Sequence, residues 1–367
     1  MKIAVAIESY LNIINSAEIG NYIKKELKDD FVRVLPVIDG GMGSVSTLKK
    51  MLGGQYQYVN VHNPLNQIVT VRYLLKGDSG IMEMAEPCGI GTIDEEDIDI
   101  MNSSSIGLGE MIVDALDKGV RNFLVCIGDS ATNDIGMGML YALGVKFLDK
   151  DNKELEPSVI NLSKVKDIDI SNMDIRLKES KFSLACNINC PLMGKNGCAN
   201  LHAKRKGATD AEVTMLENLA KDFTSLIEDK YNINMKDHPQ AGAGGGASYA
   251  MMSFLNADAK NSMDLVINYI DFKSALEGCE LLFVGEKVVN FDNSPSIKIA
   301  KIAKENNPNC KVVFLTEDFP KGLEKPKEIN AVFNLKFCLK NKTKDEEKEY
   351  YGRIIADMAR EIRGLLG

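Results

Sequence analysis

Residues 127–138 read Ile-Gly-Asp-Ser-Ala-Thr-Asn-Asp-Ile-Gly-Met-Gly, and the rest of the chain is organised around them. The apolar run 123–127 predicts a buried strand, and the residues after the stretch continue an apolar pattern with helical spacing. The glycines let the backbone approach a ligand or a neighbouring strand closely. Outward-pointing N–H groups and the positive end of the following helix suit an anion. We therefore predict a phosphate site here; the alternative is a strand-to-helix connection whose glycines serve packing only.

Two more glycine-rich turns lie between predicted strands and helices. Residues 39–44 read Asp-Gly-Gly-Met-Gly-Ser and precede a helical pattern over 45–52. Residues 240–247 read Gln-Ala-Gly-Ala-Gly-Gly-Gly-Ala and precede a helical run over 249–255. None of the three turns is a Walker A motif or a dinucleotide fingerprint, so their spacing alone does not identify the ligand.

Strands and helices alternate at both ends of the chain. Residues 2–7 predict a buried strand, and residues 15–27 predict an amphipathic helix with Asn15 and Glu18 at capping-box spacing. Past residue 277 the same alternation returns, which indicates a mainly parallel sheet covered on both faces. The middle contains an antiparallel pair, 55–61 with 67–75. We expect an N-terminal domain that the C-terminal segment completes, with the middle of the chain inserted.

Length and charge exclude several classes of protein. A chain of 367 residues is too long for one ordinary core and fits two α/β domains. The net charge of -8 and the absence of a basic stripe argue against a nucleic-acid partner. No apolar run is long enough to span a bilayer, and no cleavage-type segment follows the first strand, so we expect no membrane partner and a cytoplasmic location.

The eight cysteines are scattered, mostly within apolar patterns, and we expect reduced core thiols. Cys186, Cys190, Cys198 and His202 have the residue types of a structural zinc site. Their spacing matches neither paired knuckles nor a zinc finger, which disfavours zinc.

The ordered set of motifs resembles the type I family of bacterial glycerate kinases. The motifs are residues 39–44, Ser-Ile-Gly-Leu-Gly-Glu at 105–110, the stretch from 127 to 140, Lys-Gly-Ala at 206–208, and Ala-Gly-Ala-Gly-Gly-Gly at 241–246. The Ser-Ala-Thr-Asn-Asp run at 130–134 is the most specific of them. The resemblance covers nearly the whole chain.

The resemblance implies an α/β fold with two α/β domains. One is a flavodoxin-like, parallel-sheet domain formed by residues 1–75 and 278–367, and the other is an inserted, mixed-sheet domain over 76–277. It also implies phosphorylation of D-glycerate with ATP and Mg2+ in the cleft between the domains. Such catalysis consists mostly of positioning and charge neutralisation. The resemblance leaves open whether the chain forms a homodimer.

The resemblance also suggests site residues. Asp134 and Asp39 are the candidates for catalytic roles, and Asp134 is the candidate metal ligand; an Asx turn or a helix cap is the alternative for each. Lys206 matches the family's Lys-Gly-Ala, whereas the neighbouring lysines and arginine fit a solvated basic loop. The candidates for binding substrate or phosphate are Gly40, Gly41, Gly128, Ser130, Thr132, Asn133, Asn187, Asn189, Lys206, Gly244, Gly245 and Glu286.

Several charged family positions are replaced here by Leu11, Met42, Asn187, Asn189 and Val288, and two glycines by Asp129 and Ile135. Asparagine keeps an acceptor oxygen but carries no charge and cannot serve as a base. Three hypotheses follow: a divergent glycerate kinase, a non-catalytic binding or regulatory protein on the same fold, and a kinase for a related small hydroxy acid.

Overall fold

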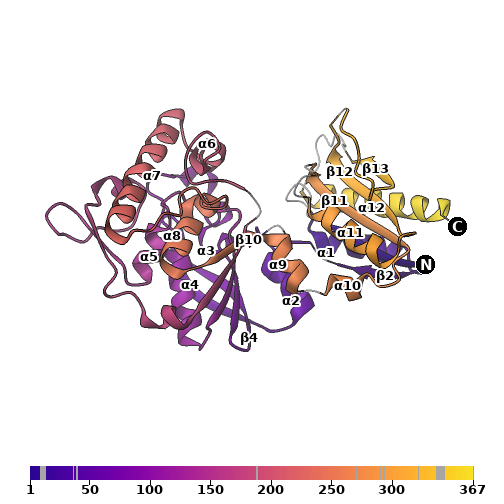
Figure 1. Cartoon of the computed structure of the whole chain (residues 1–367), viewed down its shortest axis with the longest axis horizontal. Coiled ribbons are helices and arrows are strands. Elements are labelled where there is room, and N and C mark those ends of the chain that lie inside the picture. Colours follow the sequence, from indigo (N-terminus) through magenta and orange to yellow (C-terminus); the bar gives the residue numbers. More distant parts are fainter. Residues whose placement is uncertain are drawn as a thin grey trace. The chain divides into compact units, whose positions relative to one another are not determined.

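Two compact units make up the chain, unit 1 comprising Met1–Asp39 with Met263–Gly367, and unit 2 comprising Gly40–Ser262 (Figure 1). The computed structural model describes residues 1–8, 14–35, 37–38, 40–186, 189–269, 271–289, 291, 294–320, 322–335 and 344–366. Both units are α/β. The predicted fold class, with a discontinuous first domain and an inserted second one, is confirmed.

Unit 1 contains a five-stranded parallel sheet in the order β13-β12-β11-β1-β2. In chain order this is the 2-1-3-4-5 arrangement of flavodoxin-like folds, as expected. Its elements are β1 (Lys2–Ile7), α1 (Ser16–Glu26), β2 (Phe31–Val34), α9 (Ser262–Tyr269), α10 (Phe272–Ala275), β11 (Leu281–Val288), α11 (Pro295–Asn306), β12 (Lys311–Asp318), β13 (Ala331–Asn334) and α12 (Lys344–Leu365).

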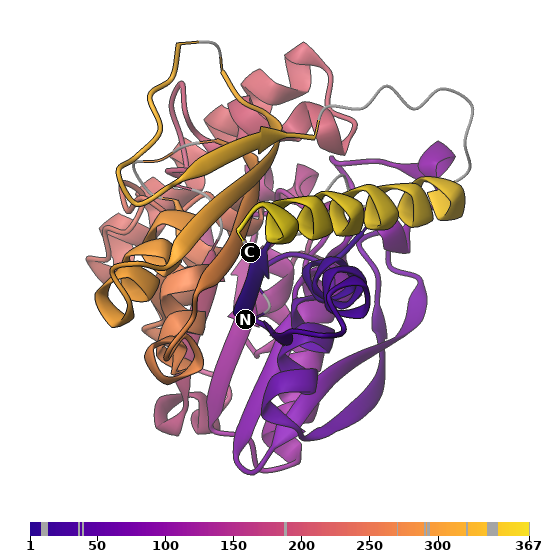
Figure 2. The ribbon, with the colours of Figure 1, turned by 90° about the vertical axis from the view of Figure 1, so that its right-hand side faces the viewer.

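The helices of unit 1 form for local reasons and cover the sheet. The predicted capping box of α1 is present: the Asn15 side chain accepts from the Glu18 N–H at 2.9 Å, and the Glu18 carboxylate accepts from the Asn15 N–H at 3.0 Å. Ile19 and Ile23 of α1 are fully buried against alternate residues of β1. Helix α12, yellow in Figure 2, lies beside α1 and contributes to the same core.

Unit 2 contains a six-stranded mixed sheet in the order β10-β9-β6-β5-β4-β3. The strands β10, β9, β6 and β5 are parallel, and β4 and β3 continue the sheet as an antiparallel hairpin. Its elements are α2 (Ser44–Leu52), β3 (Gln55–His62), β4 (Ile68–Lys76), β5 (Ser79–Glu83), α3 (Ala85–Cys88), α4 (Ile106–Asp117), β6 (Asn122–Cys126), α5 (Met137–Ala142), β7 (Lys146–Leu148), β8 (Asp167–Asp169), β9 (Lys181–Cys186), α6 (Cys198–His202), α7 (Asp210–Tyr231), α8 (Ala247–Leu255) and β10 (Asp258–Asn261).

The boundaries between the units differ from the predicted ones. The sequence placed the boundaries after residues 75 and 277, whereas the units divide after residues 39 and 262. The reason is the pairing of β4 with β5, which carries the β3–β4 hairpin into the second sheet. Helix α2 packs on β4 and β5 and therefore belongs to unit 2 as well. Antiparallel pairing between neighbours in the chain decided this, and a change in composition does not mark it.

Candidate functional site

The carboxyl ends of the parallel strands in unit 2 meet at one edge of the sheet. Strand β5 ends at Glu83, β6 at Cys126 and β9 at Cys186, and their registers align these ends. Open α/β sheets bind ligands outside such an edge. The loop that follows β6 is the stretch 127–138 that the sequence singled out.

Two of the predicted glycine turns touch each other at this edge. A Cβ atom on Gly128 would lie 2.6 Å from the Cα of Gly41 and 2.8 Å from the carbonyl oxygen of Gly40. Gly40 has a φ of +80°, and a Cβ there would lie 2.6 Å from the Ala185 carbonyl oxygen at the end of β9. Only glycine permits these approaches. The predicted residues Gly40, Gly41 and Gly128 are thus brought together.

Lys206 supplies a buried cation to the loop after β6. Its ammonium donates to the Ser130 hydroxyl at 3.1 Å and to the Thr132 carbonyl oxygen at 2.7 Å. Burial lowers the pKa of Lys206 to about 8, and the charge of Asp134 opposes that shift. Because this pKa still lies above 7, most of the protein carries a charged Lys206 at neutral pH.

Asp134 joins the starts of two helices. Its fully buried carboxylate accepts from the backbone N–H of Ser105 at 2.8 Å, from the Ser105 hydroxyl at 2.8 Å, and from the N–H groups of Gly136 at 3.1 Å and Gly138 at 2.9 Å. Ser105 precedes α4 and Gly136 precedes α5. The carboxylate therefore holds α4 and α5 together at the edge, and a metal ion at Asp134 would have to displace some of these hydrogen bonds.

The two residues between Ser130 and Asp134 that were predicted to bind are buried with unused polar atoms. The Thr132 hydroxyl and the Asn133 amide oxygen have no hydrogen-bond partner among the described residues. Buried polar atoms without partners are uncommon in native proteins and point to a bound water or ligand. Ser130, by contrast, is 7% exposed and accepts from Lys206.

The third glycine turn packs against the same loop. Gly244 and Gly245 have φ values of +65° and +66°, and a Cβ on Gly245 would lie 2.1 Å from the Thr132 carbonyl oxygen. The Ile135 N–H donates to the Gly245 carbonyl oxygen at 3.1 Å. Close packing thus accounts for both glycines, against backbone at Gly245 and against the Ile127 and Met84 side chains at Gly244. A binding role for Gly244 and Gly245 stays a prediction.

The remaining predicted residues lie elsewhere. Glu286 lies in β11 of unit 1. Its carboxylate accepts from the Ser294 hydroxyl and, at 2.8 Å, from the Ser296 N–H at the start of α11. Burial raises the pKa of Glu286. Asn189 is exposed and accepts from the Gln240 amide at 3.2 Å. Asp39 and Asn187 lie outside the described residues.

Sequence reasoning missed Glu83. This side chain is 2% exposed and accepts from the backbone N–H of Gly43 at 3.0 Å and from the N–H of Val45, at the start of α2. Burial raises the pKa of Glu83 to about 7. A single acid at the end of an apolar strand, between Met82 and Met84, was the signal that could have found it.

Two replacements of family glycines sit in left-handed backbone. Asp129 has a φ of +54° and Ile135 a φ of +55°. The Asp129 carboxylate accepts from the Met42 N–H at 3.0 Å, so a negative charge lies beside residue 42, where the resemblance expected an acid. For Ile135 the conformation carries backbone strain, because a β-branched residue rarely adopts it.

No zinc site forms from the cysteines and histidine that the sequence offered. Within the described ranges no group of three or more histidine, cysteine, aspartate or glutamate residues could hold a metal ion. The Cys198 thiol donates to the Leu192 carbonyl oxygen at 3.3 Å. Burial raises the pKa of Cys190 to about 12 and that of Cys198 to about 11, so both remain neutral thiols.

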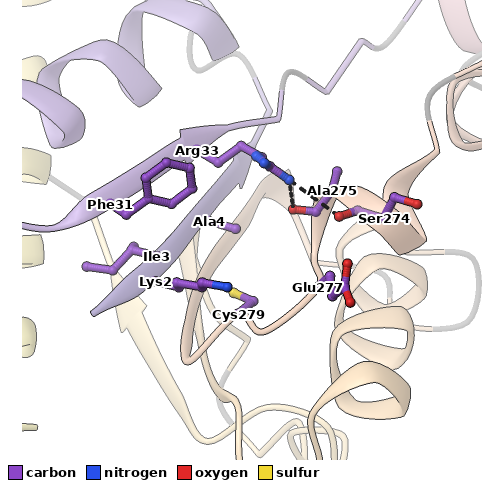
Figure 3. A pocket seen from close by; sticks show the side chains of 9 residues that line it. All are labelled: Lys2, Ile3, Ala4, Phe31, Arg33, Ser274, Ala275, Glu277 and Cys279. Carbon is purple, nitrogen blue, oxygen red and sulfur yellow. Dashed lines mark hydrogen bonds between the residues drawn. The ribbon is translucent and has the colours of Figure 1, made fainter.

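A pocket in unit 1 lies at the opposite, amino edge of its sheet (Figure 3). It has a volume of about 230 Å³, and its lining includes Lys2, Phe31 and Arg33 at the starts of β1 and β2. The Arg33 guanidinium donates to the Ala275 carbonyl oxygen at 2.7 Å. None of the predicted site residues lines this pocket.

The fold and the edge of unit 2 are typical of α/β enzymes that handle anionic small molecules, since glycine turns and a buried lysine gather where such folds bind ligands. The model of the glycerate kinase family matches residues 3–363, and the chain belongs to this family. It is therefore a kinase, as predicted. None of the helices in the described part of the chain is long and apolar enough to cross a membrane.

Named relatives agree with this assignment. The glycerate 2-kinase of Escherichia coli (strain K12) is 32% identical over 346 residues, which cover 91% of this chain and 90% of that protein. The glycerate kinase of Bacillus subtilis (strain 168) is 32% identical over 313 residues, or 83% of this chain and 82% of that protein. A crystal structure described as "putative glycerate kinase 2" from Salmonella typhimurium LT2 matches with a TM-score of 0.81 at 28% identity and covers 99% of this chain and 98% of that one.

Proposed function

We propose that this protein transfers the γ-phosphoryl group of ATP to a hydroxyl of D-glycerate, with Mg2+ as the metal. The observation that carries the proposal is the family match over residues 3–363, joined to the contact between the turns at Gly40–Gly41 and at Gly128 in unit 2. Two relatives that cover more than four fifths of this chain carry the name glycerate kinase or glycerate 2-kinase.

Lys206 is the proposed phosphate-binding cation. Phosphoryl transfer spreads negative charge over the travelling oxygens, and a fixed cation in a water-poor site stabilises that charge. The ammonium uses two donors on Ser130 and Thr132, which leaves one N–H for a phosphate oxygen. The Thr132 hydroxyl and the Asn133 amide oxygen, which have no partner in the part of the chain that the structure describes, support a polar ligand or water at this position.

Mg2+ needs few protein ligands in such a reaction. It prefers one or two carboxylates and completes its shell with phosphate oxygens and water. Asp134 was the predicted ligand, and its four hydrogen bonds favour a positioning role instead. We therefore propose that Mg2+ travels with the nucleotide phosphates. Asp39 stays the predicted second catalytic carboxylate, and Asn187, Asn189, Gly244, Gly245 and Glu286 stay predicted binding residues.

The test is turnover by purified protein. ADP release is followed with ATP and D-glycerate, with and without Mg2+, and phosphorus NMR identifies which hydroxyl carries the new phosphate. We expect turnover that disappears when EDTA removes the metal. Faster turnover of another hydroxy acid would assign a related substrate. Calorimetric binding of glycerate and nucleotide without any turnover would instead establish a binding or regulatory protein.

We further propose a cytoplasmic homodimer. Strand β3 is an edge strand of the sheet in unit 2, and Tyr58 on it and Ile68 on its partner β4 are 63% and 62% exposed. Edge strands with exposed apolar residues tend to pair with another chain. Light scattering on the purified protein measures the mass, and a monomer at micromolar concentration would contradict the dimer.

A further inference from the structure

Glu83 is a carboxylate in surroundings that do not suit one. It is 2% exposed, and its neighbours Met82 and Met84 in the chain are completely buried. An ionised carboxylate in such a place requires specific partners. Among the described residues no ion pair joins Glu83 to a cation, because the nearby Arg72 pairs with Glu86 at 3.2 Å.

The partners of Glu83 are backbone N–H groups at the start of α2. Its two oxygens accept from Gly43 at 3.0 Å and from Val45. These donors are among those that a helix N-terminus leaves unpaired, and they carry the positive end of the helix dipole. The carboxylate thus occupies the place where a helix start would otherwise hold an anion from solution.

A second carboxylate, that of Asp129, accepts a hydrogen bond from the same turn. It follows the strand β6, which pairs with β5 so that Glu83 lies opposite Cys126. Its carboxylate accepts from the Met42 N–H at 3.0 Å. The N–H groups of residues 42, 43 and 45 are therefore all taken by carboxylates from two neighbouring strand ends.

Local contacts fix the rest of the turn. The Ser44 hydroxyl donates to the Gly41 carbonyl oxygen at 2.7 Å, and the Ser46 hydroxyl to the Gly43 carbonyl oxygen at 2.8 Å. Gly41 lies against Gly128, and Gly40 against the carbonyl oxygen of Ala185. The ends of β5, β6 and β9 therefore hold residues 40–45 in one shape.

We propose that Glu83 and Asp129 are positioning residues: they close the start of α2 to phosphate and hold residues 40–45 in the shape that binds the phosphoryl acceptor. The inference rests on the proposed function and deepens it, because it assigns the two substrates to different loops at the sheet edge. Nucleotide phosphate goes to the loop of Lys206, and the small hydroxy acid goes to the turn at residues 40–45. Two carboxylates beside this turn would repel a phosphate but tolerate the alcohol end of an acceptor.

The division predicts a pH dependence. Burial raises the pKa of Glu83 to about 7, and the hydrogen bonds from the Val45 and Gly43 N–H groups oppose that shift because they favour the ionised form. Among the described residues, Asp129 is a second carboxylate that accepts a hydrogen bond from the turn. An ionised Glu83 accepts both N–H bonds, whereas the protonated acid presents a hydroxyl to one of them. Protonation therefore relieves the cost of burying the charge but weakens the two hydrogen bonds from the turn, so we expect acceptor affinity to fall as the pH drops through 7.

The experiment compares Glu83→Gln with a control variant, Glu86→Gln, in which the substituted glutamate lies three residues later in α3. Glu86 pairs with Arg72 at 3.2 Å and also accepts from the Arg72 backbone N–H at 3.4 Å. At pH 8 we expect Glu83→Gln to raise the KM for glycerate roughly tenfold, as the loss of one charge-assisted hydrogen bond does, and to change the KM for ATP less than twofold. Glu86→Gln changes neither constant. Between pH 6 and pH 8, the glycerate KM of the wild type varies and that of Glu83→Gln stays flat.

Amide hydrogen exchange separates this inference from the proposed function. Without ligands, we expect faster exchange of a peptide covering 40–52 in Glu83→Gln and in Asp129→Gly, and wild-type exchange in Glu86→Gln. Equal exchange and an equal glycerate KM in wild type and Glu83→Gln would overturn the inference while wild-type turnover upholds the function. If the wild type does not phosphorylate glycerate, the proposed function fails and the exchange data alone decide whether the two carboxylates hold the turn. Should Glu83→Gln not fold, Asp129→Gly carries the same kinetic and exchange tests, because glycine suits the φ of +54° at that position.

Discussion

Unit 1 and unit 2 both place a buried glutamate at the carboxyl end of a parallel strand, and both glutamates accept N–H groups from a helix start. In unit 1, Glu286 of β11 accepts from Ser296, ten residues further along the chain at the start of α11. In unit 2, Glu83 of β5 accepts from Gly43 and Val45, which precede it by about forty residues. The first glutamate caps the helix that follows its own strand, and the second holds a distant turn.

The difference indicates which of the two units carries the candidate functional site. Within the described part of the chain, it is the glutamate of unit 2 that lies beside contacting glycine turns and a loop bound by a buried lysine. A local cap orders one strand and one helix, whereas a distant contact ties loops from several strands into one surface. Four predictions test this contrast, from the largest expected effect to the smallest.

Lys206→Met should have the largest effect on activity. It removes a buried cation from the loop at Ser130 and Thr132, and we expect kcat/KM to fall by roughly 100-fold to 1000-fold, the loss seen when one preorganised charge donor is removed. Lys204→Met is the matched control, because Lys204 is 61% exposed in an ion pair with Asp210. Comparable losses in both variants would show that the basic segment acts only through its overall charge.

Asp134→Asn should have the largest effect on stability. The amide cannot accept all four hydrogen bonds, and it places an NH2 group against donors from Ser105, Gly136 or Gly138. We expect the free energy of unfolding to fall by about 3 kcal/mol in urea titrations. Asp149→Asn, in an exposed turn that accepts from Asp151 and Lys153, should change it by less than about 1 kcal/mol. An Asp134→Asn protein that keeps its stability but loses activity would contradict the positioning role and support a catalytic role for Asp134.

Glu83 should make stability depend on pH. Its pKa rises from an ordinary 4.5 to about 7 in the folded protein. The contribution to stability is therefore fully present below pH 4.5 and is lost as the pH rises through 7, by an amount on the order of 3 kcal/mol. Urea unfolding at pH 5 and pH 8 should show a smaller change in Glu83→Gln than in the wild type. Burial raises the pKa of Glu286 too, so Glu286→Gln should flatten the curve in the same direction.

Asp129→Gly should have the smallest effect on stability. Glycine removes the strain of a φ of +54° but loses the hydrogen bond from Met42 at 3.0 Å, two terms of about 1 kcal/mol each that oppose one another. Ile135→Gly relieves the same strain but removes an apolar side chain that is only 1% exposed. It should therefore lower the free energy of unfolding by about 2 kcal/mol. Thermal melts of both variants measure the contrast. Equal melting temperatures would show that burial of Ile135 contributes nothing.

Local pattern predicted much of the fold. The Asn15–Glu18 capping box, the β3–β4 hairpin and the strand–glycine–helix junctions are all short-range signals, and the structure contains them. The flavodoxin-like domain came from the family resemblance, which the strand order confirms. The unit boundaries were misplaced because pairing between β4 and β5 leaves no mark in composition.

The site was predicted less completely. Lys206 and the glycines at 40, 41 and 128 were named from motifs, and the structure brings the glycines into contact. Glu83 was missed because its partners lie 38 and 40 residues away, beyond the reach of a capping pattern. Gly244 and Gly245 were predicted to bind, and the structure shows their packing, of Gly244 on Ile127 and Met84 and of Gly245 on Thr132.

The sequence by itself determined the α/β class, the family and the position of the loop at 127–138, because each depends on short motifs or on residues close together in the chain. The discontinuous domain, which joins the two chain ends, was implied by the resemblance. The tertiary structure alone decided which groups share one sheet edge. In the folded chain, Lys206 donates to Ser130 and Thr132, and Asp134 accepts at the starts of α4 and α5. Glu83 and Asp129 accept from the turn that leads into α2. Burial then shifted the pKa of Lys206 down and that of Glu83 up, since desolvation depends on what surrounds a group in space and not on its neighbours in the chain.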